Sequence, residues 1–163
     1  SVSRGLGDVY KRQSLISSCC KIAAVSVNSS LSEIKRITKI GMHIGIAFQI
    51  KDDLFDYGKK TIGKPRGIDI KQKKITLPLI YTLNNINKSE KRWLIKSLKK
   101  NKKSRALINQ IISLVKERGG LDYAIQIMNK YHKLSLDDIE TFKDSPYKDS
   151  LKKMVNYVIE RNY

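Results

Sequence analysis

The stretch from Phe48 to Pro78 reads FQIKDDLFDYGKKTIGKPRGIDIKQKKITLP, and the rest of the chain is organised around it. Its first part carries three carboxylates, Asp52, Asp53 and Asp56. If this part is helical, Asp52 and Asp56 lie one turn apart on the same face. Like charges near a helix C-terminus repel one another and are opposed by the macrodipole. The pattern therefore favours a site in which a bound cation offsets the repulsion.

Basic residues follow the aspartates in a loop that glycines interrupt. They are Lys59, Lys60, Lys64, Arg66, Lys71, Lys73 and Lys74. Carboxylates suit Mg²⁺, which usually keeps waters and substrate phosphates in its shell, and nearby cations can hold those phosphates. An acidic helix end is by itself usually a solvated face, and a lysine-rich loop is usually only a soluble loop. Their combination predicts a site for a diphosphate and a metal ion.

In these residues the stretch resembles the second aspartate-rich motif and following loop of the trans-isoprenyl (polyprenyl) diphosphate synthases. The similarity runs from about Ser14 to the C-terminus and is strongest from Gly45 to Pro78. It is weaker at 118–124 and 157–161. The resemblance implies an all-α helical bundle of the isoprenoid synthase type around a deep apolar cavity, in an enzyme that is usually a homodimer. Such enzymes are prenyltransferases of isoprenoid biosynthesis, which join isopentenyl diphosphate to an allylic diphosphate.

The resemblance also implies roles for individual residues. Metal binding falls to Asp52, Asp53 and Asp56, diphosphate binding to Lys64, Lys74 and Lys11, and substrate contact to Phe48 and Gln49. In the family, Mg²⁺ and the lysines draw the allylic diphosphate away as a leaving group and stabilise the charge that develops on it. Lys11 fills the place of a family lysine that precedes the Ser-Leu-Ile-Ser segment.

The chain departs from the family in having one aspartate-rich motif where such enzymes need two on opposite walls of the cavity. We therefore interpret residues 14–163 as the C-terminal part of a synthase domain, and expect this fragment to be inactive alone. Residues 1–13 are interpreted as a non-native or disordered leader. A partial bundle should leave an apolar face uncovered, along Leu15, Cys19, Ile44 and Phe48.

Composition narrows the class of protein without identifying it. The chain has 163 residues, enough for one domain with a real core, and a net charge of +18 that is scattered over every segment. Scattered charge without an RNA- or DNA-binding motif predicts no nucleic-acid partner. The adjacent Cys19 and Cys20 suit buried, reduced core positions. No apolar run is long enough to span a membrane, so we expect a cytoplasmic protein that is not an integral membrane protein.

Helix signals recur along the chain and no segment alternates as a strand would. Ser30 and Glu33 form a capping box for a long helix from Leu31 to about Tyr57. Further helices are predicted over 76–84, after a cap at Ser89, around Leu107 to Val115, and over 121–136. Ser145 and Pro146 should open the last one. His43, which has no second metal ligand near it, is predicted to lie on the surface.

Two other classes of function remain open at this point. The chain could be a non-catalytic regulatory subunit of a heteromeric prenyl synthase, although a pure scaffold has no need of Asp52, Asp53, Asp56 and Lys64. It could also be a basic, helical nucleic-acid-binding domain, whose affinity would fall steeply with salt and show no dependence on Mg²⁺ and diphosphate.

Overall fold

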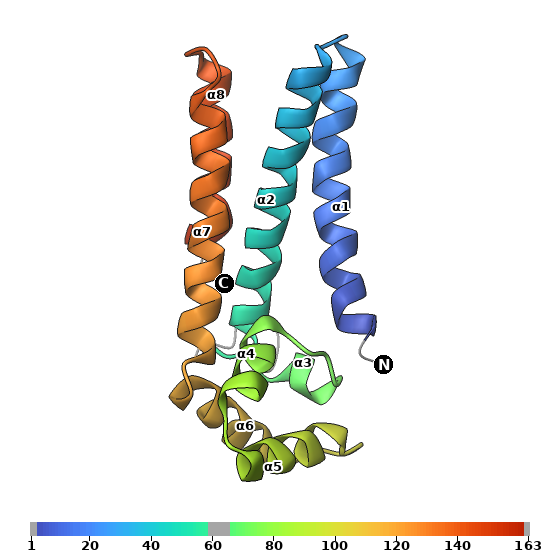
Figure 1. Cartoon of the computed structure of the whole chain (residues 1–163), viewed down its shortest axis with the longest axis vertical. Helices are drawn as coiled ribbons and strands as arrows, with labels where there is room; N and C mark the ends of the chain where they lie inside the picture. The colour runs from blue at the N-terminus through green and yellow to red at the C-terminus, as the bar shows by residue number, and fades with distance from the viewer. Residues whose placement is uncertain (1–2, 59–65, 162–163) are drawn as a thin grey trace. The chain divides into compact units, whose positions relative to one another are not determined.

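The structure, a computed structural model, describes residues 3–58 and 66–161, with side chains from residue 13 onward. Within these ranges every regular element is a helix, as predicted (Figure 1). The helices are α1 (Ser3–Ser26), α2 (Leu31–Phe55), α3 (Ile68–Lys71), α4 (Leu77–Asn85), α5 (Lys88–Lys99), α6 (Arg105–Glu117), α7 (Gly120–Glu140) and α8 (Pro146–Glu160). No helix in the described ranges is both long and apolar enough to cross a membrane.

The chain divides into two compact units, which are described separately. The first, here called the motif unit, comprises residues 52–126 together with 3–6. The second, here called the long-helix unit, comprises residues 7–51 and 127–161. Each unit has buried apolar side chains of its own.

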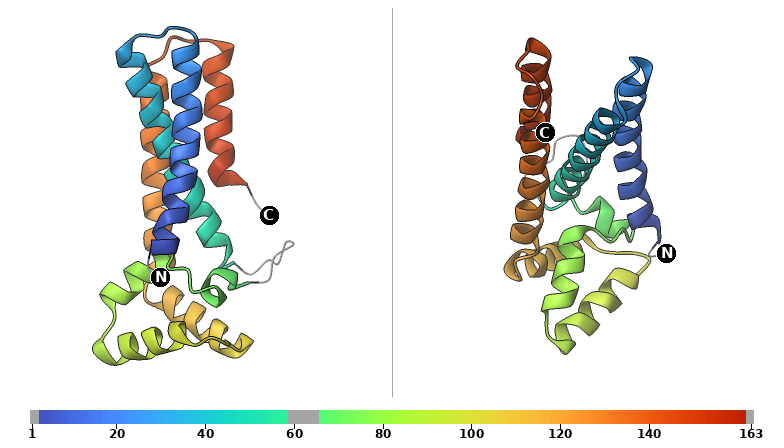
Figure 2. Two further views of the ribbon diagram at one scale, coloured as in Figure 1. Left: turned by 90° about the vertical axis from the view of Figure 1, so that its right-hand side faces the viewer. Right: turned by 45° about the horizontal axis from the view of Figure 1, so that its top comes forward.

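The long-helix unit is built from most of α1, most of α2, the second part of α7, and α8. These helices lie alongside one another in Figure 1 and again in Figure 2. Their inward faces bury a set of mainly aliphatic side chains, Ile40, Ile44, Ala47, Ile50, Met128, Ile139, Val155 and Val158. The arrangement agrees with the predicted helical bundle.

Two glycines let α1 and α2 approach closely in this unit. A Cβ atom added at Gly41 would lie 2.9 Å from the Cα atom of Ser17, and one added at Gly45 would lie 2.7 Å from that of Gln13. Ser17 also donates a hydrogen bond to the carbonyl oxygen of Thr38 at 3.2 Å. The two glycines therefore let the backbone of α1 pack directly against the backbone of α2. Each glycine lowers the stability of α2 by about 1 kcal/mol relative to alanine, because its helix propensity is low.

The face of α1 that points away from α2 is apolar and exposed. Leu15 is 64% exposed and Ile22 is 67% exposed, and Cys19 lies between them on the same face. The predicted uncovered face is thus present on α1. It does not extend to Ile44, which is only 3% exposed because it faces the core of the unit. The expectation of a buried Cys19 is also wrong, since the small-residue face of α1 is occupied by Ser17 and Cys20.

Charged residues fix the turn between α7 and α8. Ser145 accepts a hydrogen bond from the backbone N–H of Lys148 at 3.1 Å, which confirms the predicted cap. The Lys148 ammonium lies 3.0 Å from a carboxylate oxygen of Glu140 and 2.9 Å from one of Asp144, and it also donates to the Phe142 carbonyl at 3.0 Å. The hydrogen bonds to the carboxylates of Asp144 and Glu140 raise the pKa of Lys148.

The motif unit has a core formed by α3 to α6 together with Tyr57, which follows α2. Its buried members are Tyr57, Ile70, Leu79, Leu94, Ile108, Ile111, Ile112 and Val115. The predicted cap at Ser89 is wrong, because Asn87 accepts the capping bond from the backbone N–H of Glu90 at 2.9 Å. Ser104 caps α6 in the same way, accepting from Leu107 at 3.2 Å.

Several boundaries and positions differ from the prediction. α1 begins at Ser3 and therefore includes residues 3–13, which were interpreted as part of a leader; the origin of residues 1–13 stays a prediction. α7 continues to Glu140, and the short helix α3 carried no sequence signal. The prediction that His43 lies on the surface is wrong. Its side chain is only 12% exposed and lies between α2 and α7.

Candidate functional site

The three predicted aspartates lie at the end of α2, where the helix closes in tight turns. Asp52 and Asp53 belong to the last turn of α2, and the backbone N–H of Asp56 donates to the carbonyl oxygen of Asp53 at 3.3 Å. Asp53 is only 7% exposed, and the other two are partly buried. The three therefore do not form the solvated acidic face that such a pattern usually makes.

The chain returns to Asp56 after the loop. A carboxylate oxygen of Asp56 accepts a hydrogen bond from the backbone N–H of Asp69 at 3.2 Å, and its carbonyl oxygen accepts one from Gly67 at 3.1 Å. Burial, with a smaller contribution from the Asp69 charge, raises the pKa of Asp56 despite these backbone donors. Asp56 is thus a carboxylate in a place that disfavours its charge.

Lys74 lies in the same cluster. Its ammonium lies 3.0 Å from a carboxylate oxygen of Asp69, and its backbone N–H donates to the Asp69 carbonyl at 2.8 Å. No role was predicted for Asp69 from the sequence. The structure makes Asp69 the link between the aspartates and Lys74.

The two ends of the loop are joined beneath this cluster. The Tyr57 hydroxyl and the Thr76 hydroxyl are hydrogen-bonded at 2.6 Å, and both side chains are buried. Burial raises the pKa of Tyr57, so this residue stays a neutral partner of Thr76 at physiological pH. Gly67 makes the return turn with φ at +78°, a conformation that favours glycine.

The donor set suits a cation that also binds a phosphate ligand. In the ranges that the structure describes, no three acidic, histidine or cysteine side chains converge on one point, so a metal cage made of protein alone is not present there. Mg²⁺, however, usually takes one or two carboxylates and completes its shell with waters and substrate phosphates. Asp56, with its raised pKa and the like charge of Asp69 beside it, is where such an ion would relieve most repulsion.

Phe48 and Gln49 belong to the long-helix unit, in the part of α2 before the aspartates. Gln49 is 7% exposed. The guanidinium of Arg161 lies 3.8 Å from the centre of the Phe48 ring, and it donates a hydrogen bond to the Phe48 carbonyl oxygen at 3.2 Å. Arg161 is itself only 7% exposed. It lies in the weakly similar segment 157–161, and no role was predicted for it from the sequence.

Two predicted diphosphate-binding residues cannot be placed. Lys64 lies outside the described residues. Lys11 falls within α1, but its side chain is also outside them.

A groove of about 580 Å³ lies elsewhere on the motif unit, between α5 and α6. Its lining residues are Ser89, Glu90, Trp93, Asn109, Gln110, Ser113, Leu114 and Glu117. None of them is a predicted site residue. The groove is therefore distinct from the residues of the candidate site.

Comparison with known proteins identifies the family of this chain. Residues 9–115 match the family model described as polyprenyl synthetase. An octaprenyl diphosphate synthase of Haemophilus influenzae is 29% identical over 143 residues, which cover 86% of this chain and 43% of that protein. A geranylgeranyl diphosphate synthase of Sulfolobus acidocaldarius is 30% identical over 156 residues, covering 93% of this chain and 47% of that protein.

Solved structures give the same result for the fold. The geranylgeranyl pyrophosphate synthase of Bacteroides thetaiotaomicron aligns with a TM-score of 0.84 and 33% identity, covering 92% of this chain and 50% of that one. That of Pyrococcus horikoshii aligns with a TM-score of 0.85 and 26% identity, covering 94% and 47%. The chain spans about half the length of the curated relatives it matches. With its family-model match and its helical fold, the chain belongs to the polyprenyl synthetase family.

Proposed function

We propose that this chain carries part of the active site of a trans-polyprenyl diphosphate synthase. The reaction joins isopentenyl diphosphate to an allylic diphosphate and lengthens the prenyl chain. The observation that supports this most directly is the cluster of Asp56, Asp69 and Lys74, which sets carboxylates beside a cation at the end of a family-matched helix.

In this proposal Asp52, Asp53 and Asp56 hold Mg²⁺, which would supply charge to bind and neutralise the allylic diphosphate. Lys74 is held by Asp69 close to where the diphosphate would lie, and Lys64 and Lys11 are proposed to contact it as well. Phe48 and Gln49 contact the substrate. Because charge develops on the leaving diphosphate, these groups favour departure more than they favour substrate binding.

We further propose that the chain needs the remainder of a synthase to turn over. The family uses two aspartate-rich motifs and this chain has one. In the complete protein we expect a homodimer in the cytoplasm.

Binding and turnover should therefore separate experimentally. With Mg²⁺ present, an allylic diphosphate should raise the unfolding temperature of this chain, and Asp56→Asn should make the shift smaller. Incubation of the chain alone with isopentenyl and allylic diphosphates should yield no elongated product. Absence of any Mg²⁺-dependent shift would overturn the assigned site, and product formation would overturn the requirement for the rest of a synthase.

The second candidate function is a non-catalytic subunit that modulates a full-length synthase. It draws on the exposed apolar face of α1, which includes Leu15 and Ile22. Mixing this chain with a complete synthase should change the rate or product length if the chain is a modulator, and Asp52→Ala should leave that effect intact. A catalytic contribution would instead be lost in the Asp52→Ala variant.

A further inference from the structure

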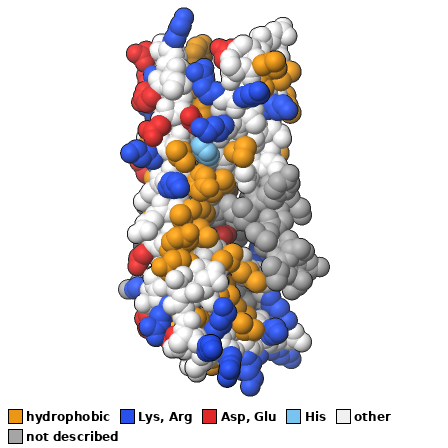
Figure 3. Space-filling model, viewed as in Figure 1, with side chains coloured by type: hydrophobic (Ala, Val, Ile, Leu, Met, Phe, Trp, Pro, Cys, Tyr) orange, Lys and Arg blue, Asp and Glu red, His pale blue; other side chains and the backbone are white. Residues whose placement is uncertain are grey.

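The positive charge is concentrated on α5 and the turn after it, contrary to the even spread expected from the sequence. Residues 88–105 contain nine lysines and arginines and one acid, Glu90, so they carry +8 of the chain's net +18. Glu90 is already engaged, because its carboxylate accepts a hydrogen bond from Arg118 Nε at 3.2 Å. Figure 3 shows lysine and arginine side chains gathered over the part of the surface where α5 lies.

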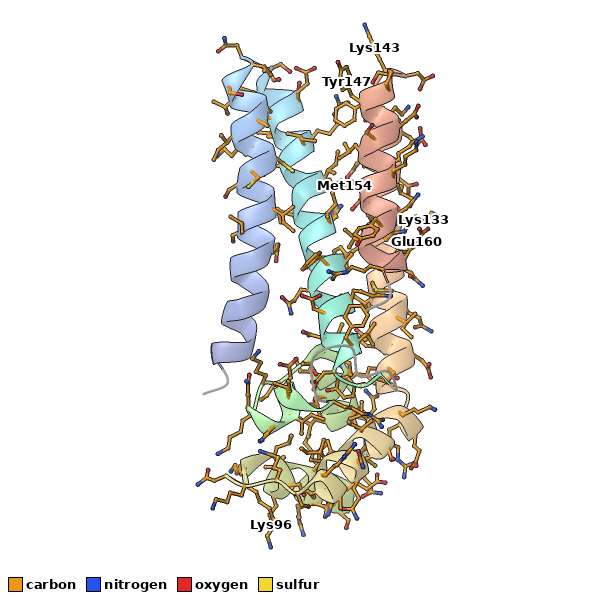
Figure 4. All side chains as sticks on the ribbon, turned by 180° about the vertical axis from the view of Figure 1, so that it is seen from behind. Lys96, Lys133, Lys143, Tyr147, Met154 and Glu160 are labelled. Atoms are coloured by element: carbon orange, nitrogen blue, oxygen red, sulfur yellow. The ribbon has the colours of Figure 1, made fainter. Side chains whose placement is uncertain are left out.

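Four of these cations form one stripe along the outer face of α5. Lys88, Arg92, Lys96 and Lys99 are spaced so that they share a face of the helix, and all four are exposed. The opposite face is buried, with Leu94 at 0% and Ser97 at 3% exposure. Figure 4 shows the labelled Lys96 pointing away from the helices. We call these four residues the α5 basic stripe.

The α5 basic stripe lowers the stability of the helix, because like charges one turn apart repel each other. In the described part of the chain, no carboxylate forms an ion pair with any of the four. A negatively charged partner outside the chain would offset this repulsion.

Apolar side chains lie on both sides of the stripe. On the helix, Trp93 falls on one side of it and Ile95 on the other. They are 38% and 37% exposed. Tryptophan is typical of membrane–water interfaces, and a helix that combines cations with Trp and aliphatic residues is typical of segments that lie on a lipid surface.

We propose that α5 docks on an anionic lipid surface, with the α5 basic stripe on the headgroups and Trp93 and Ile95 entering the acyl boundary. Each lysine or arginine near such a surface strengthens binding by roughly fivefold. A nucleic acid would also attract the cations and could stack on Trp93, but it offers nothing to Ile95. This inference is independent of the proposed function.

Trp93, the chain's single tryptophan, reports directly on this contact. The chain should sediment with vesicles of phosphatidylcholine and phosphatidylglycerol, and not with phosphatidylcholine alone. Trp93 emission should shift to shorter wavelength and be quenched by spin-labelled lipid. Replacing all four stripe residues by Gln should weaken binding by on the order of several hundredfold. Binding that is equal on both kinds of vesicle would overturn the proposal.

A matched control removes the same charge elsewhere. Lys35, Lys130, Lys133 and Lys153 are exposed, lie outside α5 and can be changed together to Gln. This variant should keep most of the binding. Equal loss in both variants would mean that net charge alone attracts the chain and would overturn the proposal. Circular dichroism of each variant checks that helix content is unchanged.

Ile95→Ser separates lipid from nucleic acid. It should weaken vesicle binding severalfold and leave binding to duplex DNA or single-stranded RNA unchanged, because only the lipid takes up the aliphatic side chain. Unchanged vesicle binding in this variant, or binding to RNA with none to vesicles, would contradict a lipid partner.

Discussion

The guanidinium of Arg161 covers one face of the Phe48 ring, with 3.8 Å between its central carbon and the ring centre, and it also donates to the Phe48 carbonyl oxygen at 3.2 Å. These residues are 113 positions apart in sequence. The end of α8 thereby fixes both the backbone and the ring of a residue that is proposed to touch the substrate.

Arg161→Met should lower the free energy of unfolding by about 2 kcal/mol, because a buried hydrogen bond and a cation–π contact are lost together. Urea denaturation followed by circular dichroism measures this. The free energy of unfolding of Arg161→Lys should lie between those of the parent chain and Arg161→Met. An ammonium cannot both cover the ring and reach the carbonyl as a planar guanidinium does.

Lys153→Gln, an exposed change on α8, is the control and should be within about 0.5 kcal/mol of the parent chain. If Arg161→Met unfolds at the same urea concentration as this control, the contact does not stabilise the fold.

Asp56→Asn should stabilise the chain in the absence of metal and weaken its binding of Mg²⁺ with diphosphate. The folded chain raises the pKa of Asp56, so it binds a proton there more readily than the unfolded chain does. This group's contribution to stability therefore increases as pH falls through the folded pKa, and it is complete below the pKa of the unfolded chain. The neutral asparagine removes the cost of the charge while its oxygen can still accept from Asp69.

The same shift predicts that protons compete with the cation at Asp56. Calorimetric titration with Mg²⁺ and an allylic diphosphate should show affinity rising with pH across the mildly acidic range. A pH dependence that is identical in Asp56→Asn would show that the proton competes elsewhere.

Gly67→Ala should destabilise the chain by about 3 kcal/mol, through backbone strain and overpacking together. Gly67 has φ at +78°, and a Cβ atom there would lie 2.2 Å from the Cγ2 atom of Ile108 in the core. Gly119 offers a matched comparison, with φ at +74° and an added Cβ no closer than 3.9 Å to the Tyr81 ring.

Gly119→Ala should therefore lower the free energy of unfolding by only about 1 kcal/mol, which is the backbone strain alone. Thermal and urea unfolding of the two variants then isolate the clash with Ile108. Shortening that side chain in Gly67→Ala/Ile108→Ala should remove the clash, and the double variant should lose less than the sum of the single losses. Equal losses for the two glycines would contradict the packing argument.

Stability should fall as pH drops through the titration range of histidine. Burial lowers the pKa of His43 in the folded chain, with Lys39 also opposing protonation and Asp138 favouring it. Asp138 and Tyr131 face it from α7, the carboxylate at 3.6 Å. Because the unfolded chain binds the proton first, this group's contribution is present above about pH 6.5 and is lost as pH falls.

His43→Gln should flatten the dependence between about pH 8 and about pH 5, measured by urea unfolding at each pH. The chain's other histidine, His132, is hydrogen-bonded through Nε2 to the amide oxygen of Asn156 at 2.9 Å and serves as the control. A slope that flattens in His132→Gln and not in His43→Gln would reverse the assignment.

Local signals predicted much of the secondary structure. The Ser30 and Glu33 capping box is present, with the backbone N–H of Ser30 donating to Glu33 at 2.9 Å, and Ser145 caps the last helix. Such signals succeed because both partners lie within a few residues. The cap at Ser89 failed because Asn87 offers an equivalent acceptor two residues earlier, and asparagine is at least as good a cap.

The missing part of the prediction was the contacts between distant residues. Asp69 is joined to Asp56 across 13 positions and Arg161 to Phe48 across 113, and no periodicity in sequence encodes either pair. Ile44 lies on the face of α2 that was expected to be uncovered, but only the packing of the other helices decides that this side chain is buried.

The glycines of α2 also determine how α1 is oriented about its own axis. Because Gly41 and Gly45 each take backbone atoms of α1 into the space of a missing methyl group, rotation of α1 would drive larger side chains into α2. Leu15 and Ile22 consequently cannot turn inward to escape water. We therefore expect any association of the chain through these two side chains to be a property of the native fold, which polar substitution at Leu15 and Ile22, and not refolding, would reduce.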